Sequence, residues 1–396
     1  MYAIDHSFHG VIVAGYDTLS SMKICVIQNV LDPFKGGNHL PLFAALKDVQ
    51  FTVVCNRSKA KPEDLPANVT VVTVPGRIGP YYYGCADYLF AKQLLTAYPH
   101  QSDFWSQFDG IHLNQVMGPA LRKLSHCPTP LLLLIHHPVT ADREVAVQES
   151  CGLNSILWKL KYFLLVRWQK AMCASAQRIV TVSQTMGKRI AADYGCSTEQ
   201  ISIVPNGVDG SLFSLTTDSS CTSDVIAVGS FVHPRKGFPY LLEAYKKITA
   251  SGREVSDVGR RSDEQRNALE KIEGVTVYGT VEESRLVELL QTSRVLISTS
   301  QFEGFGLSLI EALACGHPAF AFDKGAVPEV LESIDSNLVI SASDTVELCR
   351  RIEEYLKLSS EVRDQKGQQY RQAVLKYYPL SQSAERLHSV YKELVL

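Results

Sequence analysis

Short apolar runs rich in β-branched residues alternate with longer helical stretches from Lys23 onward, and this alternation constrains the fold more than any other feature. It is typical of βα units, which build parallel sheets. The pattern runs through the first half of the chain and then starts again in the second half. The sequence therefore predicts an α/β protein with two Rossmann-like parallel-sheet domains that face each other across a cleft.

The expected elements form two sets, one for each half of the chain. In the first half we expect strands at Ile24–Val30, Phe51–Cys55, Val69–Val74, Gly110–Asn114, Leu131–His136, Ile179–Val182 and Ile201–Val204, with helices near 38–47, 84–97, 155–173 and 183–194. In the second half we expect strands at Val225–Val228, Val275–Tyr278, Val295–Thr299, Ala319–Phe322 and Leu338–Ile340, with helices that begin at Phe238, Leu307 and Val327. Ligands bind at the carboxyl ends of parallel strands, so residues at those ends carry the most weight.

The length of 396 residues exceeds what one ordinary hydrophobic core supports. A turn-rich segment, Pro205-Asn206-Gly207-Val208-Asp209, is followed by the polar segment Ser214–Ser223, and together they predict a hinge. Met22 stands directly before the first strand and is a candidate for the true start. We expect a tail over 1–21, a first domain over 22–205, the hinge over 206–223, a second domain over 224–378 and a C-terminal helix over 379–396 that returns to the first domain.

Composition and charge exclude several classes of protein. Hydrophobic residues make up 45% and charged residues 20% of the chain, which is typical of a folded globular protein. With a net charge of −2, the protein as a whole does not attract the negatively charged phosphates of nucleic acid, so no nucleic-acid partner is expected. The ten cysteines lack metal-site spacing and are expected to be reduced. We find neither a secretory signal nor an apolar run of ~18 residues, so a cytoplasmic location is expected.

The most informative segment runs from the end of an expected strand into a helix, and reads Phe302-Glu303-Gly304-Phe305-Gly306-Leu307-Ser308-Leu309-Ile310-Glu311-Ala312. Its glycines let the main chain approach a ligand closely, and a helix start offers unpaired N–H groups to a diphosphate. A carboxylate accepts hydrogen bonds from vicinal hydroxyls, so Glu311 suits a ribose and Glu303 a transferred hexose. Gly36-Gly37 follows the first strand and offers a second, weaker phosphate or sugar site; the alternative is a simple tight turn.

This segment resembles the E-x7-E motif of family 4 retaining glycosyltransferases, which have the GT-B fold. Further segments that resemble the family are Thr181-Val182-Ser183, Val204–Asp209, Val228-Gly229, Pro234–Gly237, Ala312–Pro318 and Gly325–Val330. The likeness spans roughly 22–395 and is densest over 178–330. It implies that the first domain is the acceptor side and that the second binds a nucleotide-diphosphate sugar, with a UDP- or GDP-sugar favoured.

The resemblance also implies roles for particular residues. Lys236 would face the donor diphosphate, Glu303 the transferred sugar, and His136 the sugar near the reacting carbon, although a strand-end histidine without a role is the alternative. These three are the expected catalytic residues. The expected donor-binding residues are Gly36, Gly37, Ser230, Arg235, Lys236, Gly279, Val281, Glu303, Gly304, Phe305, Gly306, Leu307 and Glu311.

Three residues at strand ends of the first domain are candidates for the acceptor side. His112 and Asn114 end one expected strand, and turn chemistry is the alternative role for both. His137 follows His136 and is expected to help fix the loop as the alternative role. Adjacent strand residues point to opposite faces, so the two histidines make a poor metal site.

Two departures from the family pattern bear on activity. The family usually has an arginine after the glycine that opens the donor-phosphate segment, and this chain has Ser230 there. Arg235 is a candidate replacement; without one, stabilisation of the leaving group would weaken by a few kcal/mol. The segment Arg253–Arg260 has only Val255 and Val258 as apolar residues where the family has an apolar strand, so this strand is expected to be short or lost.

The expected activity is that of a retaining hexosyltransferase (EC 2.4) without metal or other cofactor, acting on a carbohydrate, lipid or small-molecule acceptor. The chain has no D-x-D motif, no Walker A motif and no complete G-x-G-x-x-G. Retaining enzymes of this fold are thought to react at the front face, with the leaving phosphate as base, so no protein nucleophile is required. The alternatives are a nucleotide-sugar epimerase or hydrolase of the same fold, and a catalytically weak nucleotide-sugar-binding protein.

Residues 158–170 mix aromatic and basic side chains in one expected helix. Lys159, Arg167 and Lys170 share a face, but Phe163 and Val166 intrude on it. Two interpretations stay open. The helix packs on its own domain, or it makes a peripheral contact with the inner membrane face to reach a lipid acceptor.

Overall fold

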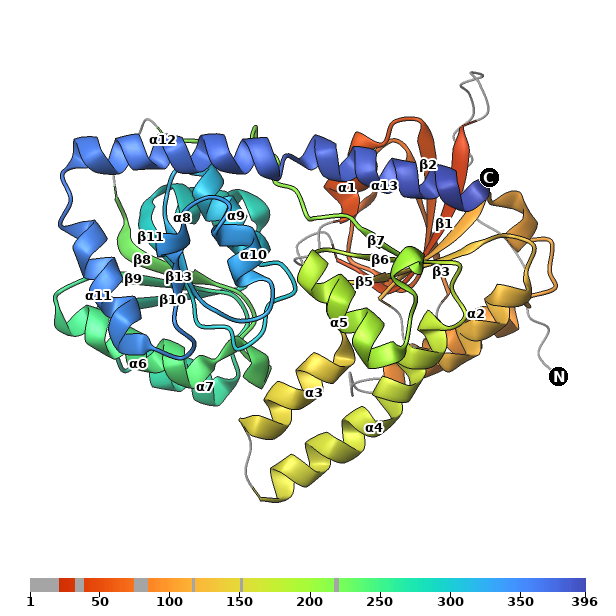
Figure 1. Ribbon diagram of the computed structural model, residues 1–396, viewed down its shortest axis with the longest axis horizontal. Helices are drawn as coiled ribbons and strands as arrows, with labels where there is room; N and C mark the ends of the chain where they lie inside the picture. Colours follow the sequence, from red (N-terminus) through yellow and green to blue (C-terminus); the bar gives the residue numbers. More distant parts are fainter. Residues whose placement is uncertain (1–20, 33–38, 75–84, 116–117, 150–151, 217–220) are drawn as a thin grey trace.

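The computed structural model describes residues 21–32, 39–74, 85–115, 118–149, 152–216 and 221–396, and they form two parallel sheets (Figure 1). The first sheet has the order β3-β2-β1-β4-β5-β6-β7 and the second β10-β9-β8-β11-β12-β13. Every pairing between neighbouring strands is parallel. The predicted α/β fold with two Rossmann-like domains is therefore confirmed.

The strands are short and mostly buried, as expected for parallel sheets covered by helices on both faces. In the first sheet they are β1 (Met22–Leu31), β2 (Val49–Ser58), β3 (Val69–Thr73), β4 (Gly110–Asn114), β5 (Leu131–Ile135), β6 (Arg178–Thr181) and β7 (Ile201–Ile203). In the second sheet they are β8 (Ser223–Val228), β9 (Val255–Val258), β10 (Val275–Gly279), β11 (Ser293–Ser298), β12 (Ala319–Phe322) and β13 (Val339–Ile340).

Helices connect the strands in both domains. Those between strands of the first sheet are α1 (His39–Ala45), α2 (Cys85–Ala97), α3 (Val139–Gln148), α4 (Leu153–Cys173) and α5 (Gln184–Tyr194). The later ones are α6 (Phe238–Ala250), α7 (Asp263–Leu269), α8 (Glu283–Gln291), α9 (Leu307–Ala314), α10 (Val327–Leu331), α11 (Thr345–Leu356), α12 (Ser360–Tyr377) and α13 (Leu380–Val395). The sequence pattern did not predict α3, which begins directly after Pro138.

The last two helices form a long rod across one side of both domains (Figure 1). α12 packs on the second domain, whereas Leu387 and Tyr391 of α13 are buried in the core of the first. The Tyr391 hydroxyl lies 2.6 Å from Nδ1 of His112, which is fully buried, and burial lowers the pKa of this histidine to about 3. The expectation that His112 lines the acceptor side is therefore wrong, because α13 covers it.

The strand expected to be short or lost is present as β9, four residues long, between β8 and β10. Its polar residue Asp257 is fully buried and has two partners. Arg261 Nη2 donates to Asp257 Oδ1 at 2.5 Å, and the Tyr245 hydroxyl donates to the same oxygen at 2.9 Å. Gly259 ends the strand with φ of 118°, and a Cβ there would lie 2.2 Å from the Gly229 carbonyl oxygen. Buried polar partners thus replace the missing apolar side chains.

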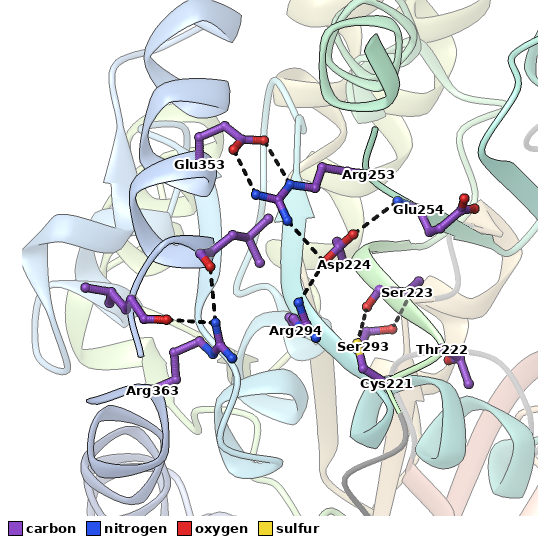
Figure 2. A network of polar contacts seen from close by, with 12 residues as sticks. Cys221, Thr222, Ser223, Asp224, Arg253, Glu254, Ser293, Arg294, Glu353 and Arg363 are labelled. Atoms are coloured by element: carbon purple, nitrogen blue, oxygen red, sulfur yellow. Dashed lines mark hydrogen bonds and ion pairs between the residues drawn. The ribbon is translucent and has the colours of Figure 1, made fainter. Parts of the chain in front are cut away.

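A network of polar contacts ties the amino ends of the second sheet to α11 (Figure 2). Arg253 donates to both carboxylate oxygens of Glu353, at 3.3 and 3.2 Å. Asp224 accepts from Arg294 at 3.1 Å, and its Oδ1 lies 3.8 Å from Arg253. The network is partly exposed and lies at the end of the sheet opposite to the carboxyl ends of the strands. It orders the domain without contributing to a ligand site.

Within the described residues, no helix combines the length and the apolar character needed to cross a membrane. The eight cysteines whose side chains the structure describes are each free of disulfide bonds.

We predict that Asp257→Ala lowers the free energy of unfolding by roughly 3 kcal/mol, because it leaves the buried Arg261 guanidinium without its carboxylate. Glu353→Ala is the matched control. It also removes an arginine partner, but from a pair that is a quarter exposed, so a loss below about 1 kcal/mol is expected. Urea unfolding monitored by circular dichroism measures both. Equal losses would contradict the role given to the buried pair.

Candidate active site

Two loops at the carboxyl ends of neighbouring strands place Lys236 beside Glu303. β8 and β11 are adjacent in the second sheet, and the segments that follow them carry these residues. Lys236 Nζ donates to Glu303 Oε1, and the Ser300 hydroxyl donates to the same oxygen at 2.8 Å. The main chains are joined as well, since Gln301 N donates to the Arg235 carbonyl at 2.7 Å. The cation and the carboxylate are thus fixed by both side-chain and backbone contacts.

Arg235 extends this cluster to the first domain. It lies in a short 3-10 helix, η5 (Pro234–Lys236). Its Nη1 donates to the Phe302 carbonyl at 2.9 Å and lies 3.6 Å from Glu303 Oε2, while its Nε lies 3.0 Å from Oδ1 of Asp142. Asp142 belongs to α3 and also accepts from His137 Nε2 at 3.1 Å. Two cations and two carboxylates therefore meet where the domains face each other.

Both carboxylates are ionised at neutral pH. Burial alone raises the pKa of Glu303, but the positive charges of Lys236 and Arg235 outweigh it and hold the pKa at about 2. Burial likewise raises the pKa of Asp142, and His137 and Arg235 bring it well below its usual range. The charges of the two cations and the two carboxylates nearly cancel. An anionic ligand can therefore contact ordered cations, although the cluster as a whole has no large net charge.

The loop between Glu303 and α9 approaches the first domain closely. A Cβ at Gly304 would lie 2.3 Å from the carbonyl oxygen of His136, so only glycine fits there. Gly306, with φ of 93°, is the N-cap of α9, and the first N–H groups of that helix follow it. Ser183 Oγ donates to the Gly304 carbonyl at 2.9 Å. The glycines therefore bring a helix start and strand β5 of the other domain together.

His136 follows β5 and is held by Gln115. The His136 backbone N–H donates to Gln115 Oε1 at 3.1 Å, and Gln115 itself has φ of 48°, in the left-handed region. Such a conformation is unfavourable for a residue other than glycine and persists where the surroundings impose it. Burial, together with the nearby His137, lowers the pKa of His136 to about 4. The ring is thus neutral at pH 7.

Glu311 lies in a separate pocket between the domains. The pocket encloses about 790 Å³, part of it open to solvent, and Leu307 and Glu283 also line it. Other lining residues come from α1, β5, the segment 204–213 and α13. Burial, reinforced by the negative charge of Glu283, raises the pKa of Glu311 to about 7. The two glutamates of the motif therefore differ: Glu303 is ionised, and Glu311 titrates near neutrality.

The remaining expected site residues are placed as follows. Ser230 is exposed, Gly279 ends β10 with φ of 71°, and Val281 packs against the second core. The Phe305 ring is buried edge-on against Tyr378, 5.3 Å between centroids. Asn114 donates to Gln28 Oε1 at 2.8 Å at the carboxyl ends of β4 and β1. Gly36 and Gly37 lie outside the described residues.

Glu329 forms a second link between the domains. Its carboxylate accepts the backbone N–H groups of Gln184 and Thr185, each at 2.8 Å, and the Thr185 hydroxyl at 2.7 Å. These N–H groups are the first of α5, where a helix start favours negative charge. Glu329 lies in one of the segments that resemble the family, but no local pattern in the sequence predicted its contact with the start of α5.

Sequence reasoning also missed Asp142 and Gln115. Pro138, followed by an acidic residue within one turn, is a helix-start signal that would have predicted α3 and placed Asp142 in its first turn. No such signal exists for Gln115. His137 lies where it was expected, fixing the loop through Asp142.

Comparison with protein families gives two matches that together cover most of the chain. Residues 43–212 match the model described as Glycosyltransferase Family 4, and residues 222–357 match the model described as Glycosyl transferases group 1. The boundary between the two matches falls in the expected hinge. Each domain thus matches on its own.

Two curated relatives illustrate the likeness in sequence. The MMP alpha-(1->4)-mannosyltransferase of Mycolicibacterium hassiacum is 31% identical over 231 residues, which cover 57% of this chain and 56% of that protein. The alpha-D-kanosaminyltransferase of Streptomyces kanamyceticus is 24% identical over 179 residues, 43% of this chain and 46% of that protein. The chain thus spans about half the length of these relatives.

Solved structures share the fold over nearly the whole chain. The sucrose-phosphate synthase of Thermosynechococcus elongatus superposes with a TM-score of 0.73 at 19% identity, covering 94% of this chain and 99% of that one. Anabaena HepE, solved with UDP and glucose, superposes with a TM-score of 0.69 at 17% identity, covering 94% and 100%. At such identities the likeness shows the fold alone.

We predict that Glu311→Gln stabilises the protein at pH 8 and leaves it nearly unchanged at pH 5. A carboxyl whose pKa rises from 4.5 to about 7 on folding costs stability as the pH rises through that interval, and glutamine removes the cost. The expected gain at pH 8 is up to about 3 kcal/mol. Urea unfolding at both pH values measures it, with the exposed Glu282→Gln as control. A Glu311→Gln variant that is less stable than the wild type at pH 8 would contradict the assignment.

Proposed function

The chain belongs to the family 4 glycosyltransferases of the GT-B fold, and on this premise we propose that it transfers a hexosyl group from a nucleotide-diphosphate sugar to an acceptor hydroxyl with retention of configuration and without a metal ion. The observation that carries the proposal is the cluster of Lys236, Glu303 and Arg235 beside the start of α9. Cations and helix N–H groups at one place suit a diphosphate.

Lys236 is the group best placed to stabilise the leaving diphosphate. Its ammonium has three hydrogens, and the bond to Glu303 uses one of them. The others remain to meet phosphate oxygens, while Glu303 holds the side chain in place. Negative charge grows on the diphosphate as its bond to the sugar carbon breaks, so an ordered cation favours the transition state over the bound substrate.

Arg235 supplies a second positive charge on the same side. It was the candidate replacement for the arginine that the family has at position 230. Its guanidinium lies in the cleft between Asp142 and Glu303 rather than in solvent. A guanidinium has five N–H donors, so it can bind these carboxylates and still reach a phosphate oxygen.

In the proposed reaction the acceptor oxygen bonds to the anomeric carbon on the face from which the diphosphate leaves. The hydroxyl proton passes to the departing phosphate oxygen, so no protein nucleophile is consumed. The backbone contact of Gly304 with His136 brings the first domain to this place. His136, neutral at pH 7, is proposed to contact the transferred sugar.

The donor and acceptor are proposed by class. A UDP- or GDP-sugar is favoured for the donor, and the structure of HepE with UDP and glucose supports a uridine donor by analogy. Glu311 is proposed to accept from the ribose hydroxyls. On the acceptor side, Asn114 and Gln28 are bonded to each other, and Asn29 donates to Asp87 at 2.7 Å. Amide groups of this kind suit the hydroxyls of a carbohydrate or of another small polar acceptor.

Two alternative functions lead to different products. A nucleotide-sugar epimerase or hydrolase would convert the donor without an acceptor. A catalytically weak binding protein, which Ser230 motivates, would bind the donor and convert nothing. The ordered cluster around Lys236 supports cleavage of the bond to the diphosphate over binding alone, and the products decide between transfer and the other reactions.

We predict that one class of sugar nucleotide stabilises the wild-type protein against thermal unfolding, by about 2.7 kcal/mol at ~100 times its dissociation constant. UDP-, GDP- and ADP-sugars are compared by differential scanning fluorimetry. Lys236→Ala and Glu311→Ala should each abolish the shift. Lys247→Ala, which removes an exposed lysine bonded to Glu243, is the control and should keep it. An unchanged shift in both site variants would contradict the donor site.

Product analysis then separates the three functions. We predict that the donor found in this way is converted to free nucleoside diphosphate much faster with a suitable acceptor from a panel of sugars, lipids and polyols than without one, and that NMR shows the anomeric configuration retained. Conversion at the same rate without acceptor would indicate an epimerase or hydrolase. Binding without conversion across the panel would favour the binding protein.

A further inference from the structure

Helix α4 carries an apolar stripe on its outer face. Ile156, Leu157, Leu160, Phe163 and Leu164 each expose between 50% and 69% of their surface. They make up five of the thirteen large hydrophobic residues that are exposed in the described part of the chain, and the others are scattered over several elements. One helix within nine residues thus holds the densest exposed apolar surface that the structure describes.

The stripe follows the helical period. At about 100° per residue, these five side chains span an arc of about 120°. The opposite arc carries Tyr162, Leu165 and Gln169, which are buried against α3 and α5. One side of the helix therefore packs on its own domain, as the first interpretation of residues 158–170 expected. The other side is exposed and is the face that the second interpretation requires.

Charges in α4 have a single sign. The helix contains Lys159, Lys161, Arg167 and Lys170 and no acidic residue. Lys159 and Lys170 lie along one edge of the stripe. Lys161 lies beyond the other edge, and its ammonium is 3.8 Å from the centre of the Trp158 ring on the packed side of the helix. Arg167 lies within the stripe, with its guanidinium 4.5 Å from the centre of the Phe163 ring. Long basic side chains at such positions keep their charge at an interface while their stems remain on apolar surface.

We propose that α4 docks on the surface of an anionic lipid bilayer, with the apolar stripe among the acyl chains and Lys159, Arg167 and Lys170 at the phosphate groups. An amphipathic helix with aliphatic and aromatic residues on one face and lysine or arginine around it binds membranes in this way. A single helix face that projects from the edge of the molecule suits a planar surface better than a groove-forming partner (Figure 1).

The charge of α4 favours an anionic lipid surface over a second copy of the chain as the partner of the stripe. A dimer formed through this stripe would place two rows of like charge together, because α4 has no acidic residue to pair with them. An anionic bilayer supplies the opposite charge along the whole helix. The stripe therefore fits a lipid surface and not its own copy.

Docking through α4 would also orient the cleft. The buried side of the same helix holds the loop that carries Arg235 and Lys236: the Tyr162 hydroxyl lies 2.8 Å from His233 Nε2, and His233 Nδ1 accepts from the Arg235 N–H at 3.1 Å. A bilayer bound on one side of α4 thus lies one helix diameter from η5. The docking itself does not rest on glycosyl transfer and is tested without any substrate.

The test is flotation of the whole chain with vesicles of phosphatidylcholine alone and of an equal mixture with phosphatidylglycerol. We expect the protein to float with the anionic vesicles, to remain in solution with phosphatidylcholine alone, and to dissociate as salt is raised. Leu160→Ser combined with Phe163→Ser should weaken the partition about tenfold or more. Val346→Ser, at a residue of α11 that is 65% exposed, is the matched control and should bind as the wild type does.

Three results would overturn the proposal. They are no flotation with anionic vesicles, flotation that the Leu160→Ser, Phe163→Ser variant leaves unchanged, and a wild-type dimer in light scattering that the same variant dissociates while no vesicle binding occurs. Circular dichroism and thermal unfolding establish that the variant is folded, which is expected because both side chains are exposed. Donor-induced thermal stabilisation should be the same in the variant and the wild type, so failure of the docking leaves the proposed function untouched.

Discussion

The contact between Lys236 and Glu303 is the interaction on which the candidate site depends. It exists because β8 and β11 are neighbours in the second sheet, so that the loops leaving their carboxyl ends lie side by side. The two loops are also joined through the Arg235 carbonyl and the Gln301 N–H. An ion pair held by backbone contacts keeps its geometry without a ligand, and a preorganised charge of this kind is worth more in catalysis than one that must be ordered during the reaction.

Contacts between the domains converge on the same loops. Asp142 of α3 reaches Arg235, Ser183 reaches the Gly304 carbonyl, and Glu329 reaches the start of α5. Each is a polar contact, and the large hydrophobic clusters lie mainly within one domain or the other. Polar interfaces of this type permit relative motion of the domains more readily than a continuous core does. The cluster at Arg235 is one of the polar contacts that join the two domains.

Two departures from the family pattern lie beside charged side chains. The strand β9 keeps its place although Asp257 replaces an apolar residue, because Arg261 and Tyr245 both donate to one oxygen of the buried carboxylate. At position 230 the side chain is short and exposed, while Arg235 holds a guanidinium in the cleft. In β9 the compensation is visible in the contacts, whereas the replacement of the usual arginine by Arg235 is part of the proposed function.

By itself, the sequence determined the two parallel-sheet domains, their strands and the loop from Glu303 to Glu311, because periodicity, glycines and a helix start are local properties of the chain. Only the tertiary structure decided which residues meet across the cleft. His112 lies in the same strand as Asn114, but a helix that begins 268 residues after His112 covers it. Asp142 became part of the site through a helix that the apolar pattern did not reveal. Such contacts join elements far apart in the chain, and they depend on how two domains and a returning helix pack, which no local pattern encodes.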